Sequence, residues 1–573
     1  MFSLLRIRSR AALTFVGGVA CFSLGACGAT PASDGNGAAN GVVGGEDAAL
    51  TGDAADDAAG DTGPVNKLDQ AKIYVSDPKT DALKTTLVTL THPTDPDGHL
   101  IGDFASVSNC LQQDGGAPLK FNGFEVGALC LETPTATRDA DQSYLSIVPP
   151  GDDSDPEDKF AELMMYYHVN QIHDFYQDGF DLALKHNPIE ALVNVTLNST
   201  INMGGGTGWQ GFPNAAFMPP EAFTAYGLPK KANGAIVFGQ YQSTDFSYDA
   251  SVIYHEYTHA MVGTTRLSGV LVDAFGLDNL PGAMNEGFAD YFSCSRRDSP
   301  IIGPYALTFQ GDFYVRDLSS GRKFPDDLTS EAHADGKIIG STLWEIRGAL
   351  GQQQADQIIL NALQSFNAST NLYGAGKLIL SEAKKVDAAT GTTVNTILKA
   401  HGILSSERAK AWAKFSVQTS AEQVPIAIAG TDQVPAGSGL NDGVPGYFQF
   451  VVKDIPAGTQ GVTLAWRAQA GQGGGLTGGG GGAPDVQLAV KKDALVMIGT
   501  NQTEADAIVT GKANAAFGKS FQSVTLTGAC LPASGGKLYI MLLNKGTSGD
   551  VTDTDIQFVS DASKSLNVVT CAK

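Results

Sequence analysis

The stretch 254–259 reads Y-H-E-Y-T-H and contains the pattern H-E-x-x-H. Residues four apart lie on one face of a helix, so His255 and His259 can direct two imidazoles at a single zinc ion. Glu256 then lies beside the ion, where a carboxylate serves as a general base. The chain has 9 histidines, so chance would rarely assemble this pattern. The pattern predicts a helix that carries two zinc ligands and a base.

A catalytic zinc ion of this kind has three protein ligands and one open position for water. In the metzincin pattern the third ligand is a histidine six residues after the second, but Thr265 stands there. Further along, Glu286 and Asp290 are four residues apart and share one face of an expected helix. We therefore expect Glu286 to be the third ligand. Asp290 is expected to hold the second ring nitrogen of a ligand histidine.

The H-E-Y-T-H stretch at 255–259, followed by N-E-G-F-A-D at 285–290, resembles the gluzincin metallopeptidases of the thermolysin and fungalysin families, and is closer to fungalysin. The resemblance implies a two-lobed α+β fold, in which a β-rich lobe carries the H-E-x-x-H helix and a helical lobe closes the zinc cleft. It implies a zinc metalloendopeptidase with one zinc ion, in which Glu256 activates the water that attacks protein or peptide substrates. Asn285 and Asp290 would support the ligands. The alternative is a buried structural histidine pair with unrelated carboxylates.

The stretch 333–345 reads H-A-D-G-K-I-I-G-S-T-L-W-E and resembles the fungalysin segment that carries the transition-state histidine. The resemblance implies that His333 stabilises the oxyanion that forms on the substrate carbonyl. An acidic residue should orient this histidine. The sequence leaves that acid open among Glu331, Asp326 and Asp327.

Two other features resemble substrate contacts of these families. Asn214 and Ala215 lie upstream of the H-E-x-x-H stretch and resemble the Asn-Ala pair of an edge strand, to which an extended substrate adds itself. Arg316 resembles an arginine that grips a substrate carbonyl oxygen. The alternatives are an ordinary strand or turn asparagine and a salt-bridge arginine.

The sequence departs from thermolysin at several positions. The tyrosine that assists the oxyanion in thermolysin would fall near Val272, so it is absent. The spacing from His259 to Glu286 is also longer than in thermolysin. Arg297 stands where a carboxylate of the paired calcium site would be, so calcium is in doubt as a cofactor.

The chain has 573 residues, too many for one hydrophobic core, so two or three folded domains are expected. Short alternating runs at 67–155 predict a β-rich region, either an N-terminal lobe of the enzyme or a retained propeptide. Residues 156–420 are expected to form the metallopeptidase domain, with helical patterning over 355–416. Strand-like runs at 421–573 predict a C-terminal β-sandwich domain, whose role is open between binding and structure.

Two further histidines, His168 and His173, lie in an expected helix that begins after Pro156. They are five residues apart and therefore share a helical face poorly. We expect them to pack or form hydrogen bonds rather than bind metal.

The first residues have the form of an export signal, with three arginines before an apolar run at 11–24 that is too short to span a bilayer permanently. The run ends L-G-A-C and resembles a bacterial lipobox, which implies removal of residues 1–26 and lipidation of Cys27. The alternative is an ordinary signal peptide cut nearby. Residues 27–66 have few large apolar side chains, which predicts a flexible acidic tether. The expected location is the bacterial cell envelope or surface, with the protein anchored to a membrane.

The net charge of −22, with no basic patch, makes nucleic acid and anionic membrane surfaces poor partners. The expected partners are protein or peptide substrates, and the sequence does not determine the oligomeric state. A rival hypothesis from another class is a surface lipoprotein that is catalytically weak or inactive and keeps the peptidase fold for binding.

An exported chain meets an oxidising compartment, where cysteines can pair. Each of two pairs lies within one expected domain, so we predict the disulfides Cys110–Cys130 and Cys530–Cys571. Cys294 is expected to remain a buried thiol.

Overall fold

The computed structural model describes residues 68–571 except for a set of internal segments. These segments are 122–123, 152–154, 156–157, 181–187, 200–207, 264–266, 268, 309–313, 412–419, 425–441, 471–484, 499–502, 514–520, 546–550 and 560–567. The predicted signal segment 1–26, the predicted tether 27–66 and Cys27 lie outside the described residues. Within the described part of the chain, no helix is both long enough and apolar enough to cross a membrane.

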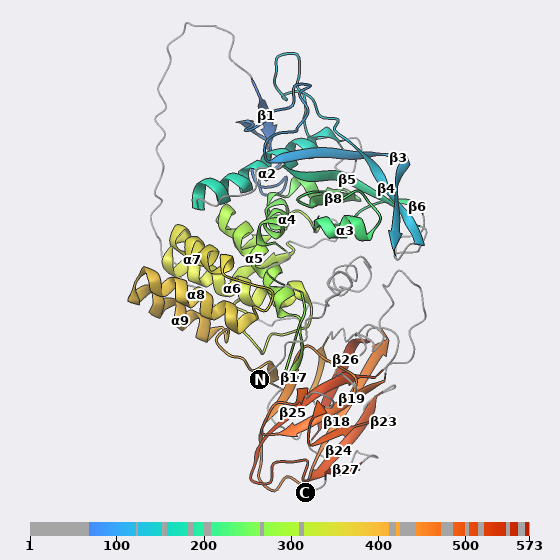
Figure 1. The fold of residues 1–573 in the computed structure, drawn as a ribbon, viewed down its shortest axis with the longest axis vertical. Coiled ribbons are helices and arrows are strands. Elements are labelled where there is room, and N and C mark those ends of the chain that lie inside the picture. Colours follow the sequence, from blue (N-terminus) through green and yellow to red (C-terminus); the bar gives the residue numbers. More distant parts are fainter. Residues whose placement is uncertain are drawn as a thin grey trace.

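One lobe, at the top of Figure 1, is built on a seven-stranded sheet whose main path has the order β3-β4-β5-β8-β7. β6 pairs with β5, and β9 pairs with β8, beside this path. The strands are β3 (Ala105–Phe121), β4 (Phe124–Thr133), β5 (Ile189–Ser199), β6 (Gly208–Gly211), β7 (Ala215–Met218), β8 (Ala235–Tyr241) and β9 (Thr244–Asp245). β8 is buried at every residue except Tyr241, as expected for an interior strand. β7 ends the main path and leaves one edge without a strand partner among the described residues.

The sheet joins residues from both sides of the predicted boundary at 155–156. β3 runs parallel to β5, with Ala105 opposite Ile189, and β4 pairs antiparallel with the far end of β5. Strands of one sheet satisfy each other's backbone hydrogen bonds, so residues 105–133 and 189–241 form a single structural unit. The predicted boundary is therefore wrong as a domain boundary, and of the two alternatives for 67–155 the structure favours an N-terminal part of this lobe. β1 (Gln70–Ile73) and β2 (Thr86–Thr89) form a small antiparallel sheet beside it.

Helix α2 (Lys159–Phe180) lies between the sheet and α4 (Ala250–Val262), which contains the H-E-x-x-H pattern. Helix α2 is the helix expected after Pro156, and its apolar side chains Phe160, Leu163 and Ile172 are fully buried. Two hydrogen bonds hold α2 to α4. His168 Nδ1 is 2.9 Å from Tyr254 Oη, and Tyr176 Oη is 2.8 Å from Thr258 Oγ1.

Helices α5 (Leu280–Arg297) and α6 (Ala332–Leu350) cross at unusually close range. A Cβ atom on Gly287 would lie 2.3 Å from Ile339 Cγ2 and 2.4 Å from the carbonyl oxygen of Gly336. A Cβ atom on Gly336 would lie 2.8 Å from the carbonyl oxygen of Ala283. Only glycine fits at this crossing, and the contact brings the start of α6 beside the middle of α5.

The helical lobe continues with α7 (Gln352–Gln364), α8 (Leu372–Val386) and α9 (Ala388–Ala400), which lie beside α6 in Figure 1. The predicted helical patterning is confirmed as far as residue 400. It is wrong for the last part of 355–416, because α9 ends at His401 and the chain then forms the strand β14 (Ala409–Ala411). β14 pairs with a strand of the C-terminal region, so tertiary pairing overrides local helical preference there.

The C-terminal region contains two six-stranded sheets, at the bottom of Figure 1. One has the main path β14-β17-β25-β19-β22 with β16 beside β25, and the other has β15-β26-β18-β24-β23 with β27 beside β24. Their strands are β15 (Ser420–Val424), β16 (Val444–Pro445), β17 (Gln449–Ile455), β18 (Gly461–Ala470), β19 (Val486–Lys492), β22 (Ala507–Val509), β23 (Lys512–Ala513), β24 (Gln522–Gly528), β25 (Gly536–Asn544), β26 (Val551–Val559) and β27 (Val568–Cys571). Trp466, Phe450 and Leu526, which come from both sheets, are buried in one apolar cluster.

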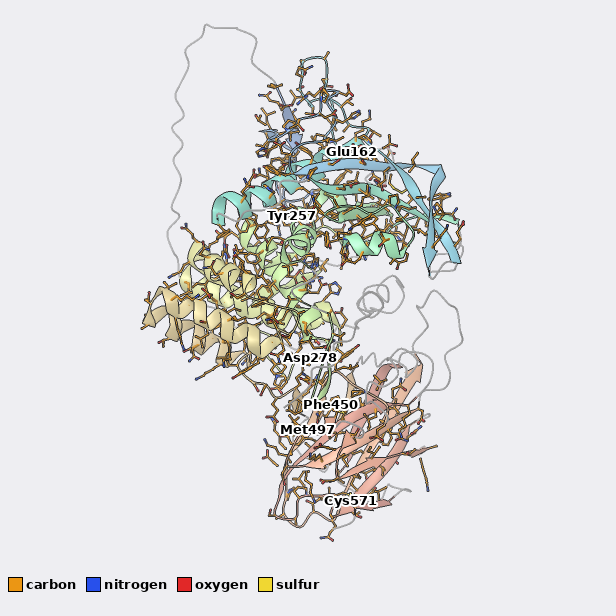
Figure 2. The ribbon with its side chains drawn as sticks, viewed as in Figure 1. Glu162, Tyr257, Asp278, Phe450, Met497 and Cys571 are labelled. Atoms are coloured by element: carbon orange, nitrogen blue, oxygen red, sulfur yellow. A yellow bond between two sulfur atoms is a disulfide. The ribbon has the colours of Figure 1, made fainter. Side chains whose placement is uncertain are left out.

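The hairpin of β10 (Leu271–Asp273) and β11 (Gly276–Asp278) joins the helical lobe to the C-terminal sheets, and Asp278 marks the place in Figure 2. The Arg408 guanidinium lies 2.6 Å from Asp273 Oδ2 and 3.1 Å from Asp278 Oδ2. Ile498 N donates to the carbonyl oxygen of Ala274 at 2.7 Å. The C-terminal sheets are therefore attached to the segment that connects α4 to α5.

The predicted disulfides are confirmed. Cys110 on β3 is bonded to Cys130 on β4, and Cys530 is bonded to Cys571 on β27. Cys294 on α5 is a buried free thiol, as predicted.

Candidate metal centre

Helix α4 begins where Asp249 accepts a hydrogen bond from Ser251 N at 3.1 Å, and it ends at Gly263, whose φ is 72°. The aspartate satisfies a free N–H group of the first turn, and the positive φ suits glycine. On the resulting helix His255 Nε2 and His259 Nε2 lie 3.0 Å apart. The i, i+4 spacing therefore brings the two imidazoles together as predicted.

Glu286 on α5 completes a group of three potential ligands. Its Oε2 lies 3.3 Å from His255 Nε2 and 3.5 Å from His259 Nε2. A point equidistant from three atoms with these separations is about 1.9 Å from each, close to the 2.0–2.2 Å of zinc–nitrogen and zinc–oxygen bonds. Glu286 Oε2 is also buried and, among the described residues, receives no hydrogen bond of good geometry. The donor set and the unsatisfied oxygen both fit a zinc ion.

The charge balance of the centre favours an ionised Glu286. Burial opposes ionisation, but the nearby imidazoles of His333, His259 and His255 outweigh it and hold the pKa of Glu286 well below its usual range. An ionised carboxylate is the form that binds a cation.

Each ligand histidine is held through its other ring nitrogen. His255 Nδ1 lies 2.8 Å from Asp290 Oδ1, and His259 Nδ1 lies 3.1 Å from Asn285 Oδ1. Both supporting residues come from α5, the helix that also carries Glu286. These contacts orient the imidazoles so that Nε2 of each faces the centre. The structure brings together all five residues that were predicted to bind or support the metal.

Arg316, on β13 (Arg316–Asp317), makes a two-point ion pair with the buried Asp290. Its Nε and Nη2 atoms donate to Asp290 Oδ2 and Oδ1, each at 2.7 Å. Burial would raise the pKa of Asp290, but the Arg316 guanidinium and His255 hold it well below its usual range. The salt-bridge alternative for Arg316 is therefore confirmed as a contact, while its predicted grip on a substrate carbonyl stays a prediction.

Glu256 lies beside the ligand histidines and faces the edge strand β7. Its Oε2 accepts a hydrogen bond from Phe217 N at 2.7 Å. The sequence analysis missed this contact, because nothing in the sequence indicates which strand lies beside α4. The bond places the candidate base next to the strand edge where an extended peptide could pair.

The structure places Ala215 at the start of β7, with Ala215 opposite Phe238 of β8. Asn214 stands just before this strand, and its carbonyl oxygen accepts from Gly239 N at 3.1 Å. Ala215 therefore lies on the edge strand, and Asn214 lies directly before it. Their contact with substrate stays a prediction.

His333 stands in the first turn of α6 and points towards the same centre. Its Nε2 lies 3.4 Å from Glu286 Oε2, and its Nδ1 lies 2.8 Å from Glu331 Oε1. The Glu286 carboxylate raises the pKa of His333, burial opposes this effect, and Glu331 adds to it. Of the three acids left open by the sequence, the structure selects Glu331.

The other two acids have different partners. Asp327 accepts from Lys323 N at 2.7 Å, and Asp326 accepts from Ala411 N at 3.4 Å. Glu331 is also the N-cap of α6, and its carboxylate accepts from His333 N at 3.0 Å and from Ala334 N at 2.7 Å. An acid directly before a helix start was the signal that could have identified it.

The two histidines predicted to lie outside the centre do so. His168 lies between Tyr254 Oη and the carbonyl oxygen of Tyr74, each at 2.9 Å, and burial lowers its pKa to about 3. His173 stacks on Phe104 with 3.6 Å between ring centroids. Both are packing or hydrogen-bonding groups, as expected.

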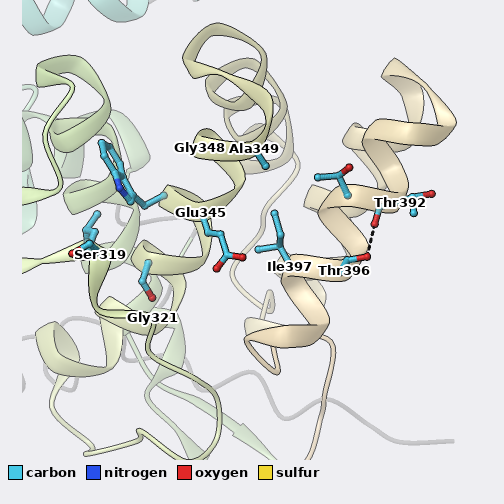
Figure 3. Close-up of a pocket in the computed structure, with 12 residues that line it drawn as sticks. Ser319, Gly321, Glu345, Gly348, Ala349, Thr392, Thr396 and Ile397 are labelled. Carbon is cyan, nitrogen blue, oxygen red and sulfur yellow. Dashed lines mark hydrogen bonds between the residues drawn. The ribbon is translucent and has the colours of Figure 1, made fainter. Parts of the chain in front are cut away.

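A separate cavity of about 750 Å³ lies between the segment 318–321, the distal half of α6 and α9 (Figure 3). Its lining includes Trp344, Glu345, Thr392 and Thr396 and none of the residues of the metal centre. The cavity is therefore distinct from the centre described above.

The residues of the centre lie in a part of the chain that matches a known protein family. Residues 133–371 match the family model of the fungalysin metallopeptidases (M36). The chain is 26% identical over 206 residues to extracellular metalloproteinase 5 of Trichophyton tonsurans, and the match covers 32% of each chain. It is 29% identical over 208 residues to the extracellular metalloproteinase mep of Aspergillus niger, covering 32% of this chain and 31% of the relative.

A third relative, the extracellular metalloproteinase MEP of Leptosphaeria maculans, is 30% identical over 208 residues, covering 32% of this chain and 30% of the relative. The chain thus spans about a third of the length of the curated relatives it matches. The matched family segment includes α4, α5 and the start of α6, and so every residue of the centre. Residues 133–371 of this chain are therefore similar in sequence to the fungalysin metallopeptidases.

Proposed function

We propose that the protein is a zinc-dependent endopeptidase in which His255, His259 and Glu286 hold one zinc ion. The observation that carries the proposal is the convergence of their three ligand atoms, which lie 3.0 to 3.5 Å from one another. One of the three, Glu286 Oε2, is buried and receives no hydrogen bond of good geometry from the described residues. When bound, the ion would polarise the scissile carbonyl and lower the pKa of an attacking water to about 7.

The protein's own residues would then move protons and stabilise charge. Glu256 would take the proton of the attacking water and pass it to the leaving amine. With both ring nitrogens protonated, the His333 imidazole would donate from Nδ1 to Glu331, at 2.8 Å, and from Nε2 to the developing oxyanion. Asp290 and Asn285 would hold the ligand histidines in the required orientation.

Substrate binding is proposed at the free edge of β7. An extended peptide can add itself to an exposed strand edge by backbone hydrogen bonds, which suits protein substrates of varied sequence. Asn214 and Ala215 stand at the start of that edge, and Phe217 N already contacts the base Glu256. Arg316 could bind a substrate carbonyl oxygen only through guanidinium N–H groups that do not donate to Asp290.

The proposed function is tested with soluble protein that begins at residue 67. Casein hydrolysis should occur, should stop with a zinc chelator and should return when zinc is added. Hydrolysis that survives chelation would reject the metal mechanism. If the protein shows no hydrolysis with zinc bound, the rival hypothesis of a catalytically weak or inactive binding lipoprotein would hold.

Export and membrane anchoring are part of the proposal. The relatives are named extracellular metalloproteinases, and the N-terminal sequence has the form of an export signal that ends L-G-A-C. We propose lipidation of Cys27, with residues 27–66 as a tether. Membrane fractionation of Cys27→Ser should show release of the protein, and undiminished membrane binding would reject the lipid anchor.

The domain organisation is proposed to have two folded parts. Residues 68–408 would form the peptidase lobes, and residues 409–571 would form a β-sandwich from the two C-terminal sheets. The proposed boundary lies before Ala409 and not at 420–421, because β14 pairs with β17 of the C-terminal region. The sandwich is proposed because both sheets contribute buried side chains to one apolar cluster.

A further inference from the structure

The loop before α6 is held by a carboxylate that has no part in the mechanism above. Asp335, in the first turn of α6, is buried and accepts hydrogen bonds from Thr329 N at 2.6 Å, Thr329 Oγ1 at 2.8 Å and Ser330 N at 3.0 Å. Glu331 N in turn donates to Thr329 Oγ1 at 3.2 Å. One side chain thus fixes the three residues that lead into the helix.

The conformation of this loop needs such support. Ser330 has a φ of 72°, which is unfavourable for a residue with a side chain. The loop is also tied to the ligand helix, because Asn279 Nδ2 donates to the carbonyl oxygen of Ser330 at 3.0 Å and Asn279 caps α5. The loop therefore links the start of α5 to the start of α6.

We propose that Asp335 is a positioning residue for His333, acting through the loop 329–331 and Glu331. The inference rests on the proposed function, in which His333 stabilises the oxyanion. The Asp335 carboxylate accepts from Thr329 and Ser330, and His333 Nδ1 contacts Glu331, so the influence of Asp335 passes through the backbone that carries Glu331. Glu331 then aims the imidazole by its 2.8 Å contact with Nδ1.

The imidazole depends on this support because its surroundings are open. The side chains of His333 and Glu331 are 40% and 38% exposed, so packing alone does not fix them. A misplacement of about 1 Å at a reacting group can cost about 10²-fold in rate. A shift of the loop would displace Glu331 and turn His333 away from the carbonyl oxygen.

The test is Asp335→Asn in the full chain. The amide keeps one acceptor oxygen but presents an NH₂ group where the second oxygen received an N–H. We expect kcat to fall by about 10- to 10²-fold, with KM within about threefold and zinc content unchanged, because the affected interaction forms mainly in the transition state. Asp356→Asn is the matched control. Asp356 is a buried carboxylate that accepts from Tyr291 Oη and Ser295 Oγ, so this variant should lose stability and keep kcat.

A double mutant separates positioning from general stability. Introduced into His333→Ala, Asp335→Asn should lower kcat no further, because residues that act as one unit are not additive. An equal loss in both backgrounds, or a lower melting temperature with unchanged kcat, would overturn the proposal. If Asp335→Asn does not fold, Thr329→Val removes only the hydroxyl of the same network and should lower kcat by a smaller factor through His333 alone. If the unaltered protein shows no zinc-dependent hydrolysis, the proposed function fails instead.

Discussion

Two histidine–carboxylate pairs approach the same ligand, Glu286, and differ in their surroundings. His255 and Asp290 are 2.8 Å apart with side chains 4% and 0% exposed. His333 and Glu331 are also 2.8 Å apart, but their side chains are 40% and 38% exposed. The first pair lies between packed helices and is clamped by Arg316, whereas the second stands on a helix start and is held by its own loop.

The difference follows from what each pair is proposed to do. A metal ligand needs a fixed position and little solvent, so burial and a two-point guanidinium clamp suit it. A group that meets a substrate carbonyl must stay accessible until substrate arrives. We therefore expect substitutions at the buried pair to weaken metal binding. Substitutions at the exposed pair should lower kcat while the metal stays bound.

The largest effect should come from Glu286, which lies between the two pairs. In Glu286→Ala, two imidazoles remain, so zinc should be lost and hydrolysis should fall to the level of the chelated protein. Elemental analysis of purified protein measures the occupancy. Glu382→Ala on α8, which removes a carboxylate that pairs with Lys385, is the control. Full zinc occupancy in Glu286→Ala would reject the ligand assignment.

Glu256 tests whether burial alone predicts metal loss. It lies on α4 between the ligands but is not one of them, so Glu256→Gln should keep zinc and the fold. The amide oxygen can still accept from Phe217 N, so β7 should stay in place. Loss of the base should lower kcat by about 10²- to 10⁴-fold. Steady-state kinetics with zinc analysis decides, and near-normal turnover would assign the base to another group.

His333→Ala tests the exposed pair directly. We expect kcat to fall by about 10²- to 10³-fold with little change in KM, since the interaction forms as charge develops. Zinc content should be unchanged. His401→Ala is the control, because His401 also pairs with a carboxylate, Glu345, at 2.7 Å, and its other ring nitrogen contacts the carbonyl oxygen of Arg322. An increase in KM alone would mean that His333 binds ground-state substrate.

The smallest expected effect is a difference in zinc affinity between variants of the two supporting carboxylates, Asp290 and Glu331. Asp290→Asn keeps one oxygen for His255 or Arg316 but not for both, so zinc affinity should weaken by about 10- to 100-fold. Glu331→Gln should leave zinc affinity unchanged, and so should Asp317→Asn, which alters the half-buried neighbour of Arg316. Competition with a chelator measures the affinity. Equal zinc affinity in all three variants would remove the distinction between the pairs.

Much of the centre was accessible from the sequence because its spacing is local. His255 and His259, and likewise Glu286 and Asp290, are four residues apart, and helix geometry places such residues on one face without reference to the rest of the chain. The disulfide pairs were predicted because each lies within one short segment of strand-rich sequence. These features need only local backbone geometry to be right.

Other predictions failed or stayed open because they depended on distant partners. The periodicity of β3 shows that it is a strand but not that it pairs with β5 beyond a long helix, so the boundary at 155–156 was misplaced. The helical pattern near 409–411 gave way to pairing with β17. Strand pairing is a long-range property that period-2 patterning does not specify.

The sequence by itself predicted the ligand set, the base and the candidate oxyanion histidine, because each residue belongs to a short motif within one of the helices α4, α5 and α6. Only the tertiary structure decided that Glu331 holds His333, that Arg316 clamps Asp290, and that β7 lies against Glu256. Glu331, Asp326 and Asp327 all carry a carboxylate shortly before His333, and only the observed contacts identify Glu331 as the partner of the imidazole. Such choices depend on how separate elements approach in space, which no local pattern records.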